Sequence, residues 1–166
     1  MTPHRWLATL YGRLPVLSKL AAGRWQAERG EVPWSHARVP LTEGSIALVT
    51  SAGVHLKSDW PFDMQNPDGD ASFRVIPSDA ALRDVTITHD YYDHRAADRD
   101  VSCVFPLERL RELAAVSKVG RVATRHIGTM GHILGAQEQR LLTDTAPTIA
   151  RLLVDDGVDY VVAAPG

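Results

Sequence analysis

The sequence predicts an α/β domain whose mostly parallel sheet is flanked by helices. Three short apolar segments, residues 45–49, 84–88 and 158–164, each lead into glycine, histidine or proline. Helical patterns with readable ends alternate with these segments, and such alternation is typical of a layered domain in which helices connect parallel strands. We expect a single sheet layer, equivalent to one half of a Rossmann-like fold.

Composition places the chain among soluble globular proteins of one domain. Of its 166 residues, 45% are hydrophobic and 23% are charged, and the net charge of −2 offers no field that would hold nucleic acid. The single cysteine, Cys103, excludes an intrachain disulfide and favours a reducing compartment, so we expect a cytoplasmic protein. Since no apolar run is long enough to span a bilayer, we expect no membrane anchor.

The first 44 residues predict a helix and an arm that precede an α/β domain of residues 45–166. Apolar side chains recur at helical spacing from Trp6 to Leu20, with basic residues between them, which indicates an N-terminal amphipathic helix. Residues 26–40 show no clear period, and we interpret them as a loop or arm.

The predicted strands direct polar groups to one edge of the sheet. Residues 45–49 form a continuous apolar run, as in a parallel strand buried on both faces, and T-S-A-G follows them. In open α/β sheets, ligands bind beyond the carboxyl ends of the strands. We therefore expect convergence there of Gly53, His55, His89 and the C-terminus.

Three helices are expected between the strands. The first begins near Pro106 and carries a leucine face, and the second lies around residues 130–134. The third is capped by Asp144 or Thr145 and ends before Gly157.

The turn after the first strand is a candidate anion site. A glycine at a strand end can present backbone N–H groups, and His55 and Lys57 add donors suited to a carboxylate. The same residues are equally compatible with an ordinary strand exit and a solvated lysine. No G-x-G-x-x-G fingerprint is present. Residues 59–78, rich in proline, aspartate and glycine, predict a long surface connection.

The segment THDYYDHRAADRDVSCVFP concentrates polar chemistry between apolar runs. Its His89-x-Tyr91-x-Asp93-His94 spacing is similar to the H-x-H-x-D-H zinc loop of metallo-β-lactamase-like hydrolases, but Tyr91 replaces the second histidine. A zinc site would then need a further ligand. The candidates are His55, His126 and His132.

A structural explanation of the same segment is that its aspartates cap turns and pair with neighbouring arginines. Cys103 follows valine and serine and precedes an apolar pair, a setting more typical of a small buried hydrophobe than of a nucleophile. We therefore assign no catalytic role to Cys103.

Five blocks in order resemble the selenoprotein B family of glycine, sarcosine, betaine and D-proline reductases. They are ALVTSAGVHLKSDWPFD, GDASFRVIP, THDYYDHRAADRDVSCVFPLERLREL, RHIGTMGHI and TAPTIARLLVDDGVDYVVAAPG. The resemblance covers residues 45–166. It implies an oxidoreductase in which a selenolate or thiolate attacks the α-carbon of a small amino acid or betaine and expels the amine.

The resemblance also implies partners and roles. A pyruvoyl-bearing partner subunit activates the substrate amine, and dithiols, as carried by a thioredoxin-like reductant, restore the oxidised enzyme. We expect a homo-oligomer with no cofactor in this chain. The implied catalytic residues are His89, Asp93 and His94. The implied substrate-binding residues are Gly53, His55, Lys57 and His126.

The family's nucleophile, commonly selenocysteine, lies just past the strand that matches residues 158–164. Here the sequence stops at Gly166, and the selenocysteine codon UGA is also a stop codon, so we expect a gene product truncated at that codon. The codon that follows Gly166 tests this expectation. Two alternatives stay open: a non-catalytic homologue that binds a carboxylate ligand or a partner subunit, and a metal-dependent hydrolase built on His89, Asp93 and His94.

Overall fold

The computed structural model describes residues 35–166. The chain forms two compact units, one of residues 1–36 and 90–93, the other of residues 37–89 and 94–166. The second unit is described by itself below. The expected N-terminal amphipathic helix lies outside the described residues, and the expected division after residue 44 stays a prediction.

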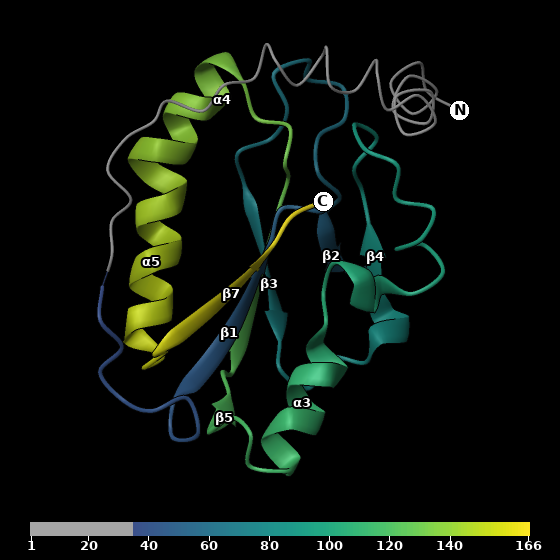
Figure 1. Ribbon diagram of the computed structural model, residues 1–166. Helices are drawn as coiled ribbons and strands as arrows, with labels where there is room; N and C mark the ends of the chain where they lie inside the picture. Colours follow the sequence, from purple (N-terminus) through teal and green to yellow (C-terminus); the bar gives the residue numbers. More distant parts are fainter. Residues whose placement is uncertain (1–34) are drawn as a thin grey trace, which may run out of the picture. The chain divides into compact units, whose positions relative to one another are not determined.

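The larger unit is an α/β domain with a mostly parallel five-stranded sheet, as predicted (Figure 1). Strand β1 (Ser45–Thr50) lies at its centre and pairs in parallel with β7 (Tyr160–Ala164) along one edge. Along its other edge β1 pairs in parallel with the short β5 (Arg121–Val122) and then with β6 (Arg125–Thr129). The predicted strands at residues 45–49 and 158–164 are therefore confirmed.

Two of the longer strands of this sheet were not predicted. Strand β3 (Phe73–Pro77) pairs antiparallel with β6, within the stretch predicted to be a surface connection. Strand β6 was missed because its R-H-I-G-T sequence lacks the continuous apolar run by which a buried strand is recognised. The helix expected around residues 130–134 does not form, because these residues make the loop that follows β6.

The third predicted strand belongs to a separate sheet. Strand β4 (Val85–Ile87) pairs antiparallel with β2 (Val54–Leu56), and these two form their own two-stranded sheet. The expectation of one sheet layer containing this strand was wrong, because β2 turns back directly after β1 and offers β4 a nearer partner than the parallel strands do.

Helix α3 (Leu107–Ala115) begins directly after Pro106, as predicted. The last helix is longer than expected, because α4 (Gly135–Arg140), a π-helical segment (Leu141–Thr145) and α5 (Ala146–Asp155) follow one another without a break. Thr145 is helical and caps nothing with its side chain, so the predicted cap at Asp144 or Thr145 was wrong. The predicted end is confirmed, with Gly157 at φ +64°.

Helices cover the sheet on both sides, with α5 on one side and α3 on the other (Figure 1). Under α5, a cluster of buried apolar side chains joins the helix to β1, to β6 and to the link between β5 and β6, namely Ala47, Ala123, Ile127, Ile149 and Leu153. Alternate residues of β1, Ile46 and Leu48, point the other way and are also fully buried. Within residues 35–166, no helix has the length and hydropathy of a membrane span.

Candidate functional site

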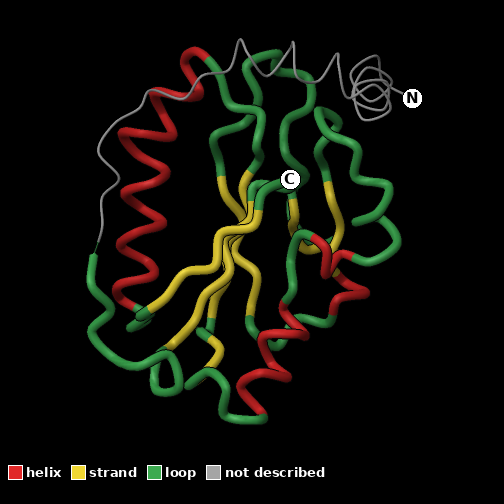
Figure 2. Tube along the Cα trace, viewed as in Figure 1, coloured by secondary structure: helices red, strands yellow, loops and turns green. Residues whose placement is uncertain are grey.

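The parallel strands β1, β6 and β7 end side by side, and the loops that leave them are tied together by backbone hydrogen bonds. Ser51 N donates to Ala164 O at 3.1 Å, and Gly53 N donates to Thr129 O at 2.9 Å. Figure 2 shows the C-terminus beside the loops that follow the strands. We call this place the strand-end site and define it by Ser51, Gly53, His89, Gly131 and Gly166.

Glycines allow the backbones of the strand-end site to approach one another. Gly53 has φ +72°, and a Cβ there would lie 2.5 Å from Thr88 O and 2.7 Å from His89 Cβ. A Cβ at Gly131 would lie 3.0 Å from Ser51 O and 3.2 Å from His89 Nε2. At Gly166 it would lie 2.6 Å from Ala52 Cα. The predicted convergence of Gly53, His89 and the C-terminus is thus observed.

His89 is held in one tautomer at this site. Its side chain is buried, and Nε2 accepts a hydrogen bond from Gly131 N at 3.0 Å. An accepting Nε2 requires a neutral ring that carries its hydrogen on Nδ1. His89 therefore links the end of β4 to the loop that follows β6.

His55 lies next to this site but has both ring nitrogens engaged. Nδ1 lies 2.7 Å from Leu56 O, and Nε2 lies 2.8 Å from Thr88 Oγ1. The ring is buried and packs edge-on against Phe62 at a centroid distance of 5.8 Å. These contacts hold β2 against β4, and in this arrangement neither nitrogen faces a ligand.

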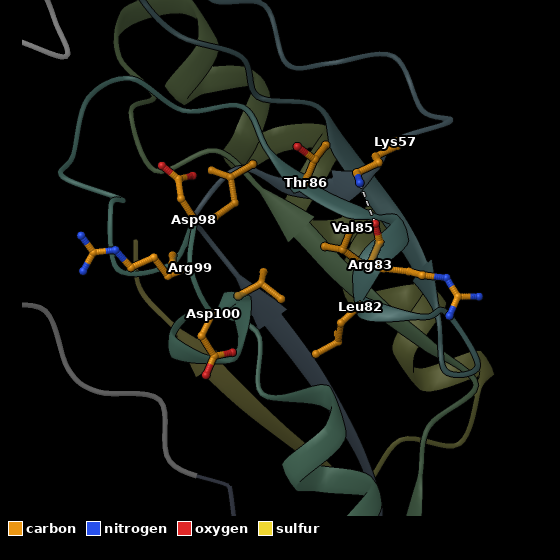
Figure 3. Close-up of a pocket in the computed structure, with 11 residues that line it drawn as sticks. Lys57, Leu82, Arg83, Val85, Thr86, Asp98, Arg99 and Asp100 are labelled. Atoms are coloured by element: carbon orange, nitrogen blue, oxygen red, sulfur yellow. Dashed lines mark hydrogen bonds between the residues drawn. The ribbon is translucent and has the colours of Figure 1, made fainter.

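Lys57 lies at another cavity, of about 360 Å³, between β4 and residues 97–101 (Figure 3). Its Nζ donates to Arg83 O at 2.7 Å. Asp98, Arg99 and Asp100 line the same cavity, so its walls carry both signs of charge. Lys57 was predicted to form one anion site with Gly53 and His55. In the structure Lys57 lines a different cavity, which neither of those residues lines.

His126 lies within β6, fully buried, and its Nδ1 accepts from Leu48 N at 3.0 Å. The ring contacts Phe105 nearly perpendicularly, at 78°. Burial, with a smaller contribution from the positive charge of Arg111, lowers the pKa of His126 to about 4. Its Nε2 has no hydrogen-bond partner among residues 35–166. His126 is therefore a neutral core residue, and its Nδ1 takes the place of a strand carbonyl as the acceptor for Leu48 N.

The remaining predicted catalytic residues are divided between the two units. His94 belongs to the larger unit, is buried, and has Nδ1 2.7 Å from Asp98 Oδ1. Asp93 belongs to the other unit, with residues 90–93. The described part of the chain contains no group of three or more histidine, cysteine, aspartate or glutamate side chains that could hold a metal ion.

Two residues of the strand-end site were not predicted. Ser51 Oγ accepts from Gly166 N at 3.4 Å, and Gly131 N donates to His89. The only sequence signals were the T-S-A-G turn after a buried strand and the glycine two residues after β6. Contacts made by main-chain atoms leave no residue-type pattern, which explains why both were overlooked.

Two characterised proteins are similar to this chain. Over 133 residues it is 38% identical to the D-proline reductase subunit gamma of Acetoanaerobium sticklandii, a match over 80% of this chain and 53% of that protein. Over 110 residues it is 33% identical to the glycine reductase complex component B subunit gamma of Carboxydothermus hydrogenoformans, a match over 61% of this chain and 24% of that protein.

The chain thus spans about half the length of the first relative and a quarter of the second. No solved structure matches it. A family model described as glycine/sarcosine/betaine reductase selenoprotein B matches residues 25–165, a range that contains the blocks that carried the sequence resemblance except for their last residue, Gly166. The chain belongs to the glycine/sarcosine/betaine reductase selenoprotein B family.

Proposed function

We propose that this chain is part of a multi-subunit reductase that cleaves the C–N bond of a small amino acid or betaine. Family membership supports the reaction class, and both relatives are named as subunits of larger reductases. The observation that carries the proposal is the strand-end site, where the end of β7 lies against the turns that follow β1 and β6.

We place the nucleophile of this reaction directly after Gly166, as the family resemblance implies. A selenol or thiol there would supply the anion that bonds to the α-carbon as the C–N bond breaks and the amine leaves with a proton. The site fits such a group, because Gly166 lies against Ala52 without room for a side chain of its own and the chain leaves β7 over this turn. A dithiol then breaks the new bond between the selenium or sulfur and the α-carbon. The carbon takes up a proton, the selenol or thiol is restored, and the dithiol becomes a disulfide.

The chain's own residues orient the substrate. Gly53 leaves room for the close approach of β4, and His89, held by Gly131 N, places a neutral imidazole at the strand ends. His94, paired with Asp98, is a second candidate to hold the amine or carry its proton. His55, Lys57 and His126 act indirectly, through the packing described above.

The partners follow from the same chemistry. A pyruvoyl-bearing subunit would bind the substrate amine, and a thioredoxin-like protein would deliver the dithiol electrons. A reducing cytoplasm suits both the dithiol and the single cysteine of this chain. These partners, and assembly into a homo-oligomer, belong to the proposal.

Reconstitution tests the proposal. The full natural reading frame that contains this sequence is co-expressed with its candidate partner subunit, and the complex is supplied with a dithiol and glycine, sarcosine, betaine or D-proline. We expect substrate-dependent oxidation of the dithiol, matched by the amine released, or by the ring-opened amino acid in the case of proline.

A variant with His89→Asn provides the control, because it loses the titratable ring while keeping a short polar side chain next to Gly131. Its dithiol oxidation is expected to fall by at least tenfold. Binding of a substrate without any dithiol oxidation in the assembled wild-type complex would instead favour the non-catalytic homologue.

A further inference from the structure

We propose that the open edge of β4 binds an extended, acidic segment of another protein chain, which adds to the small β2–β4 sheet as a third strand. The segment would lie in the cavity of about 360 Å³ between β4 and residues 97–101 (Figure 3). Only the identification of that chain as a partner subunit rests on the proposed function, since both relatives are named as subunits. The binding site itself follows from the hydrogen bonds and charges around β4.

Strand β4 has one edge that is paired with β2 and one that is not. Thr88 N donates to Gly53 O at 2.9 Å, in the same register as the pairing of Thr86 two residues earlier. Bonded positions alternate along an antiparallel pair, so the backbone groups of Thr86 and Thr88 face β2. Those of Val85 and Ile87 therefore point away from β2, toward the other edge.

Three backbone groups on this open edge are available to a further strand. Val85 N donates to Leu82 O and so closes the turn before the strand. Val85 O, Ile87 N and Ile87 O have no hydrogen-bond partner within residues 35–166. An acceptor, a donor and a second acceptor at this spacing form an edge to which an extended chain adds through main-chain hydrogen bonds.

The cavity lies along the same edge. Side chains of successive strand residues point to opposite faces of a sheet, yet Val85, Thr86 and Ile87 all line the cavity. A space that all three reach lies at the side of the strand rather than over one face. Ile87 is only half-buried, and the cavity volume is within the range of ligand-binding pockets, so an incoming chain has room at this edge.

The charges around the cavity favour an acidic segment. Both carboxylates that line it already have partners, because Asp98 Oδ1 lies 2.7 Å from His94 Nδ1 and Asp100 Oδ1 accepts from a backbone N–H at 2.9 Å. The guanidinium groups of Arg83 and Arg99 also belong to lining residues, and neither pairs with another group in the described part of the chain. Figure 3 shows them on opposite sides of the cavity. A segment with an acidic side chain at each end would pair with both.

The strand that would be extended leads into the strand-end site. β4 has three residues, and the chain runs on from Ile87 through Thr88 to His89. A sheet of two short strands gains stability when another strand is added. The bound segment would therefore brace the part of the chain that places His89.

The experiment combines the full chain, labelled for NMR, with a synthetic peptide. The probe is acetylated and amidated Glu-Val-Thr-Val-Glu, which has high strand propensity and a carboxylate at each end. We expect the amide resonance of Ile87 to shift as the peptide is added to millimolar concentration. At saturation the hydrogen exchange of this amide should slow by about tenfold or more, whereas the amide of Thr88, already bonded to Gly53 O, should change little.

Modified peptides separate backbone pairing from charge. Methylation of one alternate set of peptide nitrogens removes the donors that face β4 and should weaken binding by about tenfold or more, whereas methylation of the other set, which faces away, is the matched control. Replacement of both glutamates by lysine should also weaken binding by about tenfold or more, since it brings like charges to Arg83 and Arg99.

Two variants test the edge from the side of the protein. Ile87→Pro removes the outward N–H and leaves the bonds to β2 in place, because proline is tolerated on a strand edge whose N–H faces away from the partner strand. Its affinity for the peptide should fall by about tenfold or more, and Ile87→Val should keep the parent's affinity. If Ile87→Pro does not fold, the two methylated peptides decide the question on the parent.

The inference is overturned by a peptide that does not bind, by equal binding of the two methylated peptides, or by resonance shifts confined to β7. Because no substrate, nucleophile or dithiol is present, each of these outcomes is separate from success or failure of the reductase reaction.

Discussion

At the scale of single residues, the histidines of this chain divide according to what their nitrogens bind. His89 accepts from a backbone N–H at the strand-end site. Both ring nitrogens of His55 and Nδ1 of His126 instead make hydrogen bonds that hold strands together. Sequence spacing could place all three near a sheet, but it could not distinguish them, because the difference lies in partners contributed by remote segments. Only His89 keeps the location that was predicted for it.

The buried His126 predicts a pH dependence of folding. Its pKa is about 4 in the folded chain, against 6.5 for an unperturbed histidine, so the unfolded chain binds a proton first as the pH falls. Stability should be unaffected by this group above pH 6.5 and should decline between about pH 6.5 and 4, by on the order of 3 kcal/mol. Urea unfolding across this range measures the decline.

His126→Asn is the informative variant, because its Oδ1 can still accept from Leu48 N but does not titrate. The variant should show a flatter pH dependence than the parent, whatever its stability at neutral pH. His36→Asn, at an exposed position, should keep the parent's slope. Equal slopes in the parent and His126→Asn would contradict the assignment.

At the scale of elements, the sequence predicts those strands and helices that are uniform along their length. β1, β7 and α3 have continuous apolar or leucine patterns and were predicted correctly. β6 and β3 were missed because buried polar or small residues, such as His126 and Gly128, interrupt their patterns. Gly128 is required by contact, since a Cβ there would lie 1.9 Å from Val54 O, and such a contact is invisible until β2 is placed.

The same limit applies to the candidate site. The arrival of Gly53, His89 and the C-terminus at one edge followed from strand order alone, because parallel strands end together. The roles of Ser51 and Gly131 depend on main-chain atoms from three strands and could not be predicted from residue type. The start of the last helix was missed for a related reason, since the π-helical segment carries the helix through the predicted cap.

An ion pair anchors the end of α5 to the sheet and predicts a second effect. Asp156, which caps α5, accepts two hydrogen bonds from Arg125 of β6, at 2.6 and 2.5 Å. The bonds from Arg125 lower the pKa of Asp156, so its contribution is present at neutral pH and is lost as the pH falls through that lowered value.

Asp156→Asn should therefore lower Tm at pH 7 by about 2 to 4 °C and should cost less at pH 3. Differential scanning calorimetry at the two pH values measures this. Asp155→Asn, a neighbouring exposed carboxylate without this pair, serves as the control. A Tm loss that does not diminish in acid would show that the charge of Asp156 is not its cause.

At the scale of the whole molecule, the sheet of the larger unit has β7 as an edge strand that no strand among residues 35–166 covers. Val161 and Val162, which point to opposite faces, are 49% and 45% exposed. A short apolar edge without charge, proline or bulge is a surface on which a second strand adds readily.

We predict that the purified chain associates through this edge. Val162→Lys places a charge beside β7 and should shift the protein toward the monomer in sedimentation velocity at high concentration. Val154→Lys, on the exposed side of α5, should not have this effect, although Val154 is 73% exposed. Equal association in all three proteins would show that β7 is not the contact.

The lack of space for a side chain at the three glycines of the strand-end site has a final consequence: it limits which substitutions the chain tolerates there. Because the strand-end site is assembled from carbonyl oxygens and main-chain nitrogens, its shape depends less on which side chains surround it than on the empty space at Gly53, Gly131 and Gly166. In a library that samples every substitution, these positions should accept almost nothing, while the solvent-facing positions of the same loops vary freely. Such a map would outline the site without any knowledge of its substrate.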